Sequence, residues 1–195
     1  MTPEEIFQRL ERELGSQVVF GFDAGEGKAK DAFCQVEPSS MGVVCRLLRT
    51  DPDLGFDTLE CLTGIDRPKE QQILLVYHVC SRAKKHRLVL KTALDRADPV
   101  APSVTDVWSA ANWLERECFD LLGVLFVGHP DLRRLLLPED WEGYPLRKDY
   151  QQKPHYHGIP TTRPSPLELL GRAKAAPAKG GTAGPAAKPA DGGAP

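Results

Sequence analysis

The sequence predicts an α+β fold, a single domain in which helices pack on a mixed, meander-rich sheet. Two neighbouring β-like runs, Gln72–Cys80 and His86–Leu94, are joined by the charged turn Ser81–Lys85 and predict a hairpin. Helical patterns precede and follow this hairpin, at the N-terminus and over Ser103–Leu122. At 195 residues, such a domain can bury a core of its own and still leave an appendage.

The N-terminal helix is predicted from its end signals. Thr2 and Glu5 have the spacing of a capping box, and Pro3 stands at the first helical position. Gly15 is a natural stop. The apolar stripe between these signals consists of Ile6, Phe7, Leu10 and Leu14.

Short β-like runs follow, and they predict the rest of the sheet. They are Val18–Phe22, Ala32–Glu37, Val43–Leu48 and Leu59–Leu62. Between the last two, Thr50–Asp53 has the pattern of the start of a short helix. Gln72–Cys80 is apolar in both alternation phases, which predicts a central strand covered on both faces, whereas His86–Leu94 has one wetter face.

The pattern over Ser103–Leu122 is the strongest helix prediction in the chain. Ser103 with Asp106 resembles a capping box, and Gly123 supplies the break after the helix. One apolar stripe contains Val107, Ala111, Leu114, Cys118 and Leu121. Trp113 and Phe119 lie off this stripe on opposite sides, so the helix either sinks deep into its own domain or contacts a second protein.

Composition divides the chain into three parts: a folded body over residues 1–150, an extended partner-docking segment over residues 151–171, and a tail over residues 172–195. Prolines punctuate the docking segment, and the Ala/Gly/Pro/Lys tail is expected to be disordered. From residue 151 onward the net charge is +4, which leaves −6 on the body. An acidic body argues against nucleic-acid binding, while the basic end could lie along an acidic partner.

The sequence predicts no cofactor, metal or catalytic site within this chain. Its five cysteines lack a CxxC pair and are expected to be reduced, buried thiols without an iron–sulfur cluster. No phosphate-binding or nucleophile motif is present. The longest apolar run, Ile73–Tyr77, is too short to span a bilayer, and the acidic N-terminus does not resemble a secretory signal. Membrane association is therefore expected only through a partner.

Two carboxylates flank the apolar stripe of the last helix. Glu115 and Glu117 point away from each other, so they cannot share a substrate atom as a general acid/base pair. Each is expected to be partly buried and to need a cationic partner, unless it is a plain solvated charge. The cations expected to supply the pairing are Arg133, Arg134, Arg147 and Lys148.

The histidines give weak signals. His129 stands before Pro130 in a turn and is expected to act as a hydrogen-bonding strut. His155 and His157 have a spacing that a metal could use, but no cysteine or carboxylate lies close in sequence to complete a site.

The segment from Gly143 to Tyr150 combines aromatic and basic residues, which are enriched at protein interfaces, although a well-ordered surface loop is the alternative. With the preceding helix it forms an ordered series of motifs: PSVTDVW (102–108), AANWLERE (110–117), Asp120, Gly123, GHPDLRR (128–134) and DWEGYPLRKDY (140–150). In these motifs the chain resembles the C subunit, or thirty-kilodalton subunit, family of proton-translocating NADH:quinone oxidoreductase (respiratory complex I). The motif residues expected at a partner interface are Glu115, Arg116, Glu117, Asp120, His129, Pro130, Arg133, Arg134, Trp141, Gly143, Pro145, Arg147, Lys148 and Asp149.

The resemblance implies a non-catalytic assembly subunit of the peripheral arm, on the cytoplasmic face of the bacterial inner membrane. Its implied partners are the quinone-site (forty-nine-kilodalton type) subunit and neighbouring iron–sulfur subunits, while FMN, iron–sulfur clusters and quinone belong to other subunits. One alternative is the equivalent subunit of a membrane-bound hydrogenase or of a dehydrogenase with another electron donor. A second is a free-standing adaptor, or a metal-dependent enzyme that uses His155 and His157.

Overall fold

The computed structural model describes residues 1–25 and 31–161, and the chain divides into two compact units, Met1–Gln151 and Gln152–Pro195. The elements described in the first unit are α1 (Pro3–Leu14), β1 (Val19–Asp23), β2 (Phe33–Val36), the 3-10 helix η1 (Pro38–Ser40), α2 (Met41–Thr50), β3 (Thr58–Arg67), β4 (Gln72–Ser81), β5 (His86–Asp95), β6 (Val100–Pro102), α3 (Ala111–Leu122) and β7 (Leu125–Val127). No helix in the described ranges is long and apolar enough to cross a membrane.

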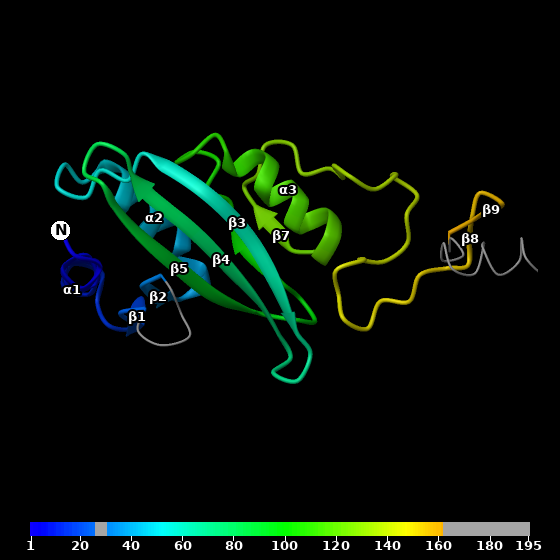
Figure 1. Cartoon of the computed structure of the whole chain (residues 1–195), viewed down its shortest axis with the longest axis horizontal. Helices are drawn as coiled ribbons and strands as arrows, with labels where there is room; N and C mark the ends of the chain where they lie inside the picture. The colour runs from blue at the N-terminus through cyan, green and yellow to red at the C-terminus, as the bar shows by residue number, and fades with distance from the viewer. Residues whose placement is uncertain (26–30, 162–195) are drawn as a thin grey trace, which may run out of the picture. The chain divides into compact units, whose positions relative to one another are not determined.

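The first unit is built on a five-stranded sheet with the order β1-β2-β5-β4-β3 (Figure 1). Strands β3, β4 and β5 form an antiparallel meander, while β2 pairs with β5 in parallel. The β4–β5 register runs without a break from Gln72↔Asp95 to Ser81↔His86, and Lys85 takes a positive φ of 54° in the connecting turn. The predicted α+β fold with a mixed, meander-rich sheet is confirmed.

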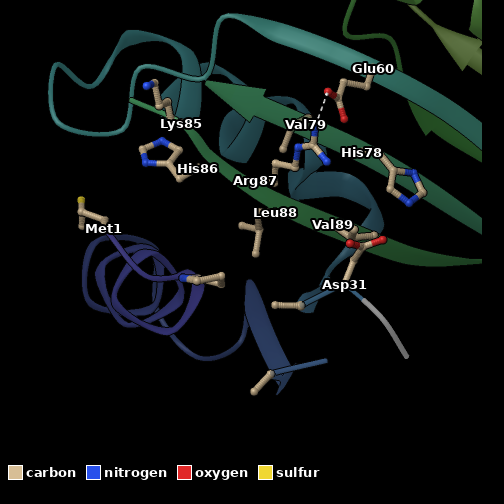
Figure 2. A pocket seen from close by; sticks show the side chains of 13 residues that line it. Met1, Asp31, Glu60, His78, Val79, Lys85, His86, Arg87, Leu88 and Val89 are labelled. Carbon is tan, nitrogen blue, oxygen red and sulfur yellow. Dashed lines mark ion pairs between the residues drawn. The ribbon is translucent and has the colours of Figure 1, made fainter. Parts of the chain in front are cut away.

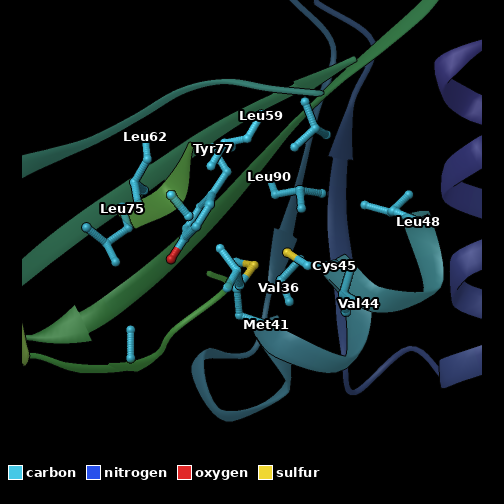
Figure 3. Close-up of a cluster of buried hydrophobic side chains, with 14 of the residues drawn as sticks. Val36, Met41, Val44, Cys45, Leu48, Leu59, Leu62, Leu75, Tyr77 and Leu90 are labelled. Carbon is cyan, nitrogen blue, oxygen red and sulfur yellow. The ribbon is translucent and has the colours of Figure 1, made fainter. Parts of the chain in front are cut away.

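One face of the sheet carries the main core. Ile73, Leu75 and Tyr77 of β4 pack there with buried residues of α1, α2 and α3, so the helices cover this face. Figure 3 shows the part of this cluster formed by α2 and the sheet. Leu74 and Val76 point to the opposite face, where they form a smaller buried cluster. The prediction that this strand is buried on both faces is therefore confirmed.

Helix α1 follows its sequence signals. The Thr2 hydroxyl accepts the backbone N–H of Glu5, and the Glu5 carboxylate accepts the backbone N–H of Thr2, which completes the capping box. Ile6 and Leu10 are fully buried, and Gly15 ends the helix with a φ of 92°.

The predicted strand Val43–Leu48 is wrong, because this segment lies within helix α2. Its β-branched pair, Val43 and Val44, favoured a strand, but the buried residues recur at helical spacing. They are Met41, Gly42, Val44, Cys45 and Leu48. Packing of this stripe against the sheet outweighs the local β propensity.

The predicted helix start at Thr50–Asp53 is also wrong, because α2 ends at Thr50 and a turn follows. The carboxylate of Asp51 accepts the backbone N–H groups of Asp53 at 2.7 Å and Leu54 at 3.3 Å. It also pairs with Arg9 of α1 at 2.7 Å. An acidic residue that was expected to begin a helix instead closes a turn and ties it to α1.

The helix predicted from Ser103 starts eight residues later, at Ala111. Val104–Trp108 forms a turn that is closed by hydrogen bonds from the N–H groups of Val107 and Trp108 to the carbonyl of Val104. Ser103 does not cap it with Asp106, because its hydroxyl lies 2.7 Å from the carboxylate of Glu115. A tertiary contact has replaced the local cap.

In the second unit, the structure describes residues 152–161. The strands β8 (His155–Tyr156) and β9 (Ile159–Pro160) form a small antiparallel hairpin. His157 and Gly158 both have positive φ in its turn, as a tight hairpin turn requires. The sequence predicted no regular element here. Residues 162–171 of the predicted docking segment and the tail 172–195 lie outside the described residues.

A candidate partner interface around helix α3

The segment after β7 returns to close the C-terminal end of α3. The N–H of Leu146 donates to the carbonyl of Leu121 at 3.1 Å, and Nε–H of Arg147 donates to the carbonyl of Leu122 at 2.8 Å. Both acceptors are among the carbonyls that a helix leaves unpaired at its end, where a cation is also favoured. Gly123 has a φ of 76°, and a Cβ on it would lie 2.5 Å from the Tyr144 ring. Glycine is therefore required at this position.

Asp120 is the buried anchor of this segment. Its side chain has no exposed surface and accepts a hydrogen bond from Arg134 at 2.9 Å. Its other oxygen accepts the backbone N–H groups of Leu135, Leu136 and Leu137 at 3.0, 2.7 and 2.9 Å. Burial alone would raise the pKa of Asp120, but these donors outweigh it and hold the pKa below its usual value. One carboxylate thus fixes three consecutive residues of the loop.

Two arginines extend this network through backbone carbonyls. Arg116, on α3, donates to the carbonyls of Arg133 and Arg134, each at 3.1 Å. Arg134 also donates to the carbonyl of Trp141 at 2.9 Å. The guanidinium of Arg116 lies 5.1 Å from the ring centre of Trp113. These charged groups are used inside the chain, where they hold the loop on the helix.

His129 ties the loop to the start of α3. Its Nδ1 accepts the backbone N–H of Asp131 at 3.0 Å, so in the neutral ring Nε2 carries the proton. Nε2 lies 3.2 Å from the carbonyl of Asn112 and donates to it. The prediction that His129 acts as a hydrogen-bonding strut is confirmed.

A second anchor joins the end of this segment to the sheet, and no sequence pattern signalled it. Asp66 of β3 is buried and pairs with Arg96 through two hydrogen bonds of 2.7 and 3.1 Å. It also accepts the backbone N–H of Lys148 at 2.7 Å, while Arg96 reaches Asp149 at 2.6 Å. The hydrogen bond from Arg96 is the largest cause that lowers the pKa of Asp66. These partners lie 53 and 82 residues apart in the chain, so local patterns could not reveal them.

Glu115 does not have the cationic partner that the sequence predicted. It is completely buried, and its carboxylate is bound by the Ser103 hydroxyl and by the backbone N–H of Val104, each at 2.7 Å. Burial raises the pKa of Glu115 to about 7, although both hydrogen bonds act in the opposite direction. The arginines expected to reach it have other partners: Arg133 pairs with Asp131, Arg134 with Asp120, and Arg147 with the carbonyl of Leu122.

A pocket of about 430 Å³ lies at the start of β5, beside His86, Arg87 and Leu88 (Figure 2). Arg87 and Glu60 form an ion pair of 3.7 Å across its rim. Nε2 of His86 lies 2.7 Å from the carbonyl of Leu54 and donates to it. None of the motif residues named from the sequence lines this pocket.

No disulfide joins the cysteines of the described residues. Cys34, Cys45, Cys80 and Cys118 are buried, Cys61 is half-buried, and all five are free thiols. Burial raises the pKa of Cys34 and that of Cys118 to about 12, so neither is a thiolate at neutral pH. Across residues 1–25 and 31–161, no group of three or more His, Cys, Asp or Glu side chains could hold a metal ion.

Comparison with known proteins shows which family the chain resembles. Residues 34–156 match the model of the respiratory-chain NADH dehydrogenase, 30 Kd subunit. The chain belongs to this 30 Kd subunit family. A curated relative from Chlorobium phaeobacteroides, the C subunit of its NADH-quinone oxidoreductase, is 42% identical over 149 residues, which cover 76% of this chain and 89% of the relative. The corresponding protein from Roseiflexus castenholzii is 47% identical over 120 residues, covering 61% of this chain and 69% of the relative.

Solved structures show the same fold. The trypsin-resistant fragment (1-134) of Nqo5 superposes with a TM-score of 0.54 at 24% identity, covering 68% of this chain and all of the fragment. A chain of the membrane-bound sulfane sulfur reductase, an archaeal respiratory membrane complex, superposes with a TM-score of 0.61 at 25% identity. That match covers 76% of this chain and 85% of the other.

In this 30 Kd subunit family member, the motif residues fall into three classes of exposure. The buried ones are Glu115, Arg116 and Asp120; the half-buried ones are His129, Arg134, Trp141, Pro145 and Arg147; the exposed ones are Glu117, Pro130, Arg133, Gly143, Lys148 and Asp149. Large apolar side chains are also exposed on α3 and on the loop that returns to it: Trp113 (58%), Leu136 (62%) and Leu146 (52%). The sequence signalled Trp113 by its place off the apolar stripe, but it did not single out the two leucines.

Proposed function

We propose that this chain is a structural subunit of the peripheral arm of an NADH:quinone oxidoreductase and that it docks its partners through the surface around α3. The observation that carries the proposal is that charged residues hold the returning loop within the chain, while large apolar side chains beside them stay exposed. Asp120, Arg116 and Arg147 hold the returning loop within the chain. Trp113, Leu136 and Leu146 remain exposed on the surface that this loop creates.

These exposed side chains share one scaffold. Trp113 lies on α3, the N–H of Leu136 donates to the carboxylate of Asp120, and the N–H of Leu146 donates to the carbonyl of Leu121. Glu117 is exposed one helical turn after Trp113, so both lie on the same side of α3. An exposed tryptophan on a rigid scaffold is typical of an interface hot spot, and the two exposed leucines add apolar area to this surface.

In this proposal the chain has no catalytic site, and FMN, iron–sulfur clusters and quinone are held by other subunits. The partners would be the quinone-site (forty-nine-kilodalton type) subunit and neighbouring iron–sulfur subunits. The chain would reach the cytoplasmic face of the bacterial inner membrane only as part of that complex.

A double substitution of the exposed apolar residues, Trp113→Ala with Leu136→Ala, tests the proposal. The matched control is Phe20→Ala with Val43→Ala, two side chains that are 40% and 52% exposed on β1 and α2. We expect the test variant to lose intact complex and NADH:quinone activity in membranes, while the thermal unfolding of the purified chain stays unchanged. A normal yield of active complex, or an equal loss in the control, would contradict the proposed surface.

The likeness to the sulfane sulfur reductase complex favours a second candidate, the equivalent subunit of a respiratory membrane complex with another electron donor. Gentle detergent purification through this chain separates the two. A complex that contains flavin and oxidises NADH supports the first candidate, and an intact complex that does not oxidise NADH supports the second.

A further inference from the structure

The buried carboxylate of Glu115 is the start of a chain of hydroxyl groups. Its Oε2 lies 2.7 Å from Oγ of Ser103, and that oxygen lies 2.9 Å from Oγ1 of Thr105. Ser103 is buried with Glu115, whereas Thr105 is half-buried in the turn that precedes α3. The chain of oxygens therefore runs from a fully enclosed acid toward the protein surface.

Each hydroxyl can donate and accept, so the hydrogen bonds of this chain can run in either direction. When Glu115 is charged, Thr105 donates to Ser103 and Ser103 donates to the carboxylate. When Glu115 is protonated, its own O–H donates to Ser103, and Ser103 donates to Thr105. The backbone N–H of Val104 donates to the other oxygen of Glu115 at 2.7 Å in the structure, and it can do so in both states.

We propose that Glu115 is a buried proton-binding site that exchanges its proton with solvent through Ser103 and Thr105. In the outward transfer, Glu115 gives its proton to Oγ of Ser103, Ser103 passes its own proton to Oγ1 of Thr105, and Thr105 releases one to water. Rotation of the two hydroxyls restores the original direction of the hydrogen bonds. One proton leaves, Glu115 gains one negative charge, and the fold does not need to open. This inference does not depend on the proposed function.

Among the buried groups that interact with one another here, Glu115 is the one that titrates near neutral pH. Burial raises its pKa to about 7, within the neutral range. Burial also raises the pKa of each thiol and phenol that interacts with it, so these groups stay neutral. Asp106 opposes ionisation of Glu115, and its own carboxylate pairs with Arg46 at 2.9 Å. The interacting neutral groups are Cys45 of α2, Tyr77 of β4 and Cys118 of α3.

The titration can be followed by NMR of the full chain with isotope-labelled glutamate side-chain carboxyls. We expect one carboxyl signal with a midpoint near 7, and we expect Glu115→Gln to remove that signal. Glu117→Gln, on the exposed side of the same helix, is the control that should leave it in place. A Glu115 signal that titrates at the ordinary glutamate pKa, or does not titrate before unfolding, would overturn the site.

The route is tested by removing one hydroxyl at a time. Ser103→Ala should raise the midpoint, because the carboxylate loses a donor. Thr105→Val should keep the midpoint near the wild-type value but slow proton exchange, which would broaden the Glu115 signal through its midpoint. Thr63→Val, at an exposed position of β3, is the matched control and should change neither. Wild-type exchange rates in both Ser103→Ala and Thr105→Val would exclude this route.

Discussion

Replacing Asp120 with alanine should strongly destabilise the folded chain, because this carboxylate fixes the returning loop from inside. The substitution removes the acceptor of three backbone N–H groups and leaves the guanidinium of Arg134, 20% exposed, without its partner. Breaking a buried ion pair by removing one member costs about 3–5 kcal/mol. The higher helix propensity of alanine offsets roughly 0.5 kcal/mol of this loss.

Asp131→Ala is the matched control. Asp131 pairs with Arg133 at 2.9 Å, the same distance as the Asp120–Arg134 pair, but its side chain is 54% exposed and that of its partner is 70% exposed. An exposed pair contributes about 1 kcal/mol or less, because water screens both charges. The two variants thus remove the same residue type at the same pairing distance, and they differ in burial and in the three backbone N–H groups that Asp120 accepts.

The free energy of unfolding should be measured by urea titration, with circular dichroism and tryptophan fluorescence as independent probes. We expect Asp120→Ala to lose at least about 2 kcal/mol more stability than Asp131→Ala, with coincident transitions by both probes. If the two variants lose the same amount, burial of the Asp120 pair is not what holds the loop, and the reasoning fails.

Three further substitutions test other contacts. Burial raises the pKa of Glu115 in the folded chain, so its contribution to stability is fully present below its ordinary pKa and is lost as pH rises through about 7. The expected decline in unfolding free energy is at most about 3 kcal/mol, and urea titrations of Glu115→Gln should lack it. Gly123→Ala should lower the unfolding free energy by more than Gly128→Ala. Both glycines have positive φ, which costs alanine about 1–2 kcal/mol, but only at Gly123 would a Cβ press against Tyr144. Equal losses in thermal unfolding would contradict this. Arg147→Ala should cost about 1.5–3 kcal/mol of unfolding free energy through the lost hydrogen bond to the Leu122 carbonyl, so assembly and stability should fall together. A variant with unchanged stability that fails to assemble would instead favour a direct partner contact.

Where the controlling interactions are local, the elements followed from the sequence. The capping box of Thr2 and Glu5 satisfies the first N–H groups of α1 with side chains three residues away. The apolar alternation of Gln72–Cys80 and its charged turn similarly predicted β4 and its pairing with β5. The motif residues from 102 to 150 carried the resemblance to the 30 Kd subunit family, which the match over residues 34–156 confirms.

Local patterns failed where distant partners compete for the same groups. Val43–Leu48 has β propensity, but burying one side of it against the sheet requires a helix. Ser103 has the spacing of a helix cap, but its hydroxyl donates to the carboxylate of Glu115, 12 residues away, and α3 begins only at Ala111. In both segments the tertiary contact outweighs the local preference, which is worth about 1 kcal/mol or less.

By itself, the sequence determined the fold class, the family and the set of charged residues around α3. Only the tertiary structure decided which of these charges face inward. Asp120 and Arg116 bind backbone groups that come together after the loop returns, and Asp66 meets Lys148 across 82 residues of chain. Backbone N–H and carbonyl groups are present at every residue and leave no mark in sequence, so their pairing with buried charges emerges only when the chain has folded.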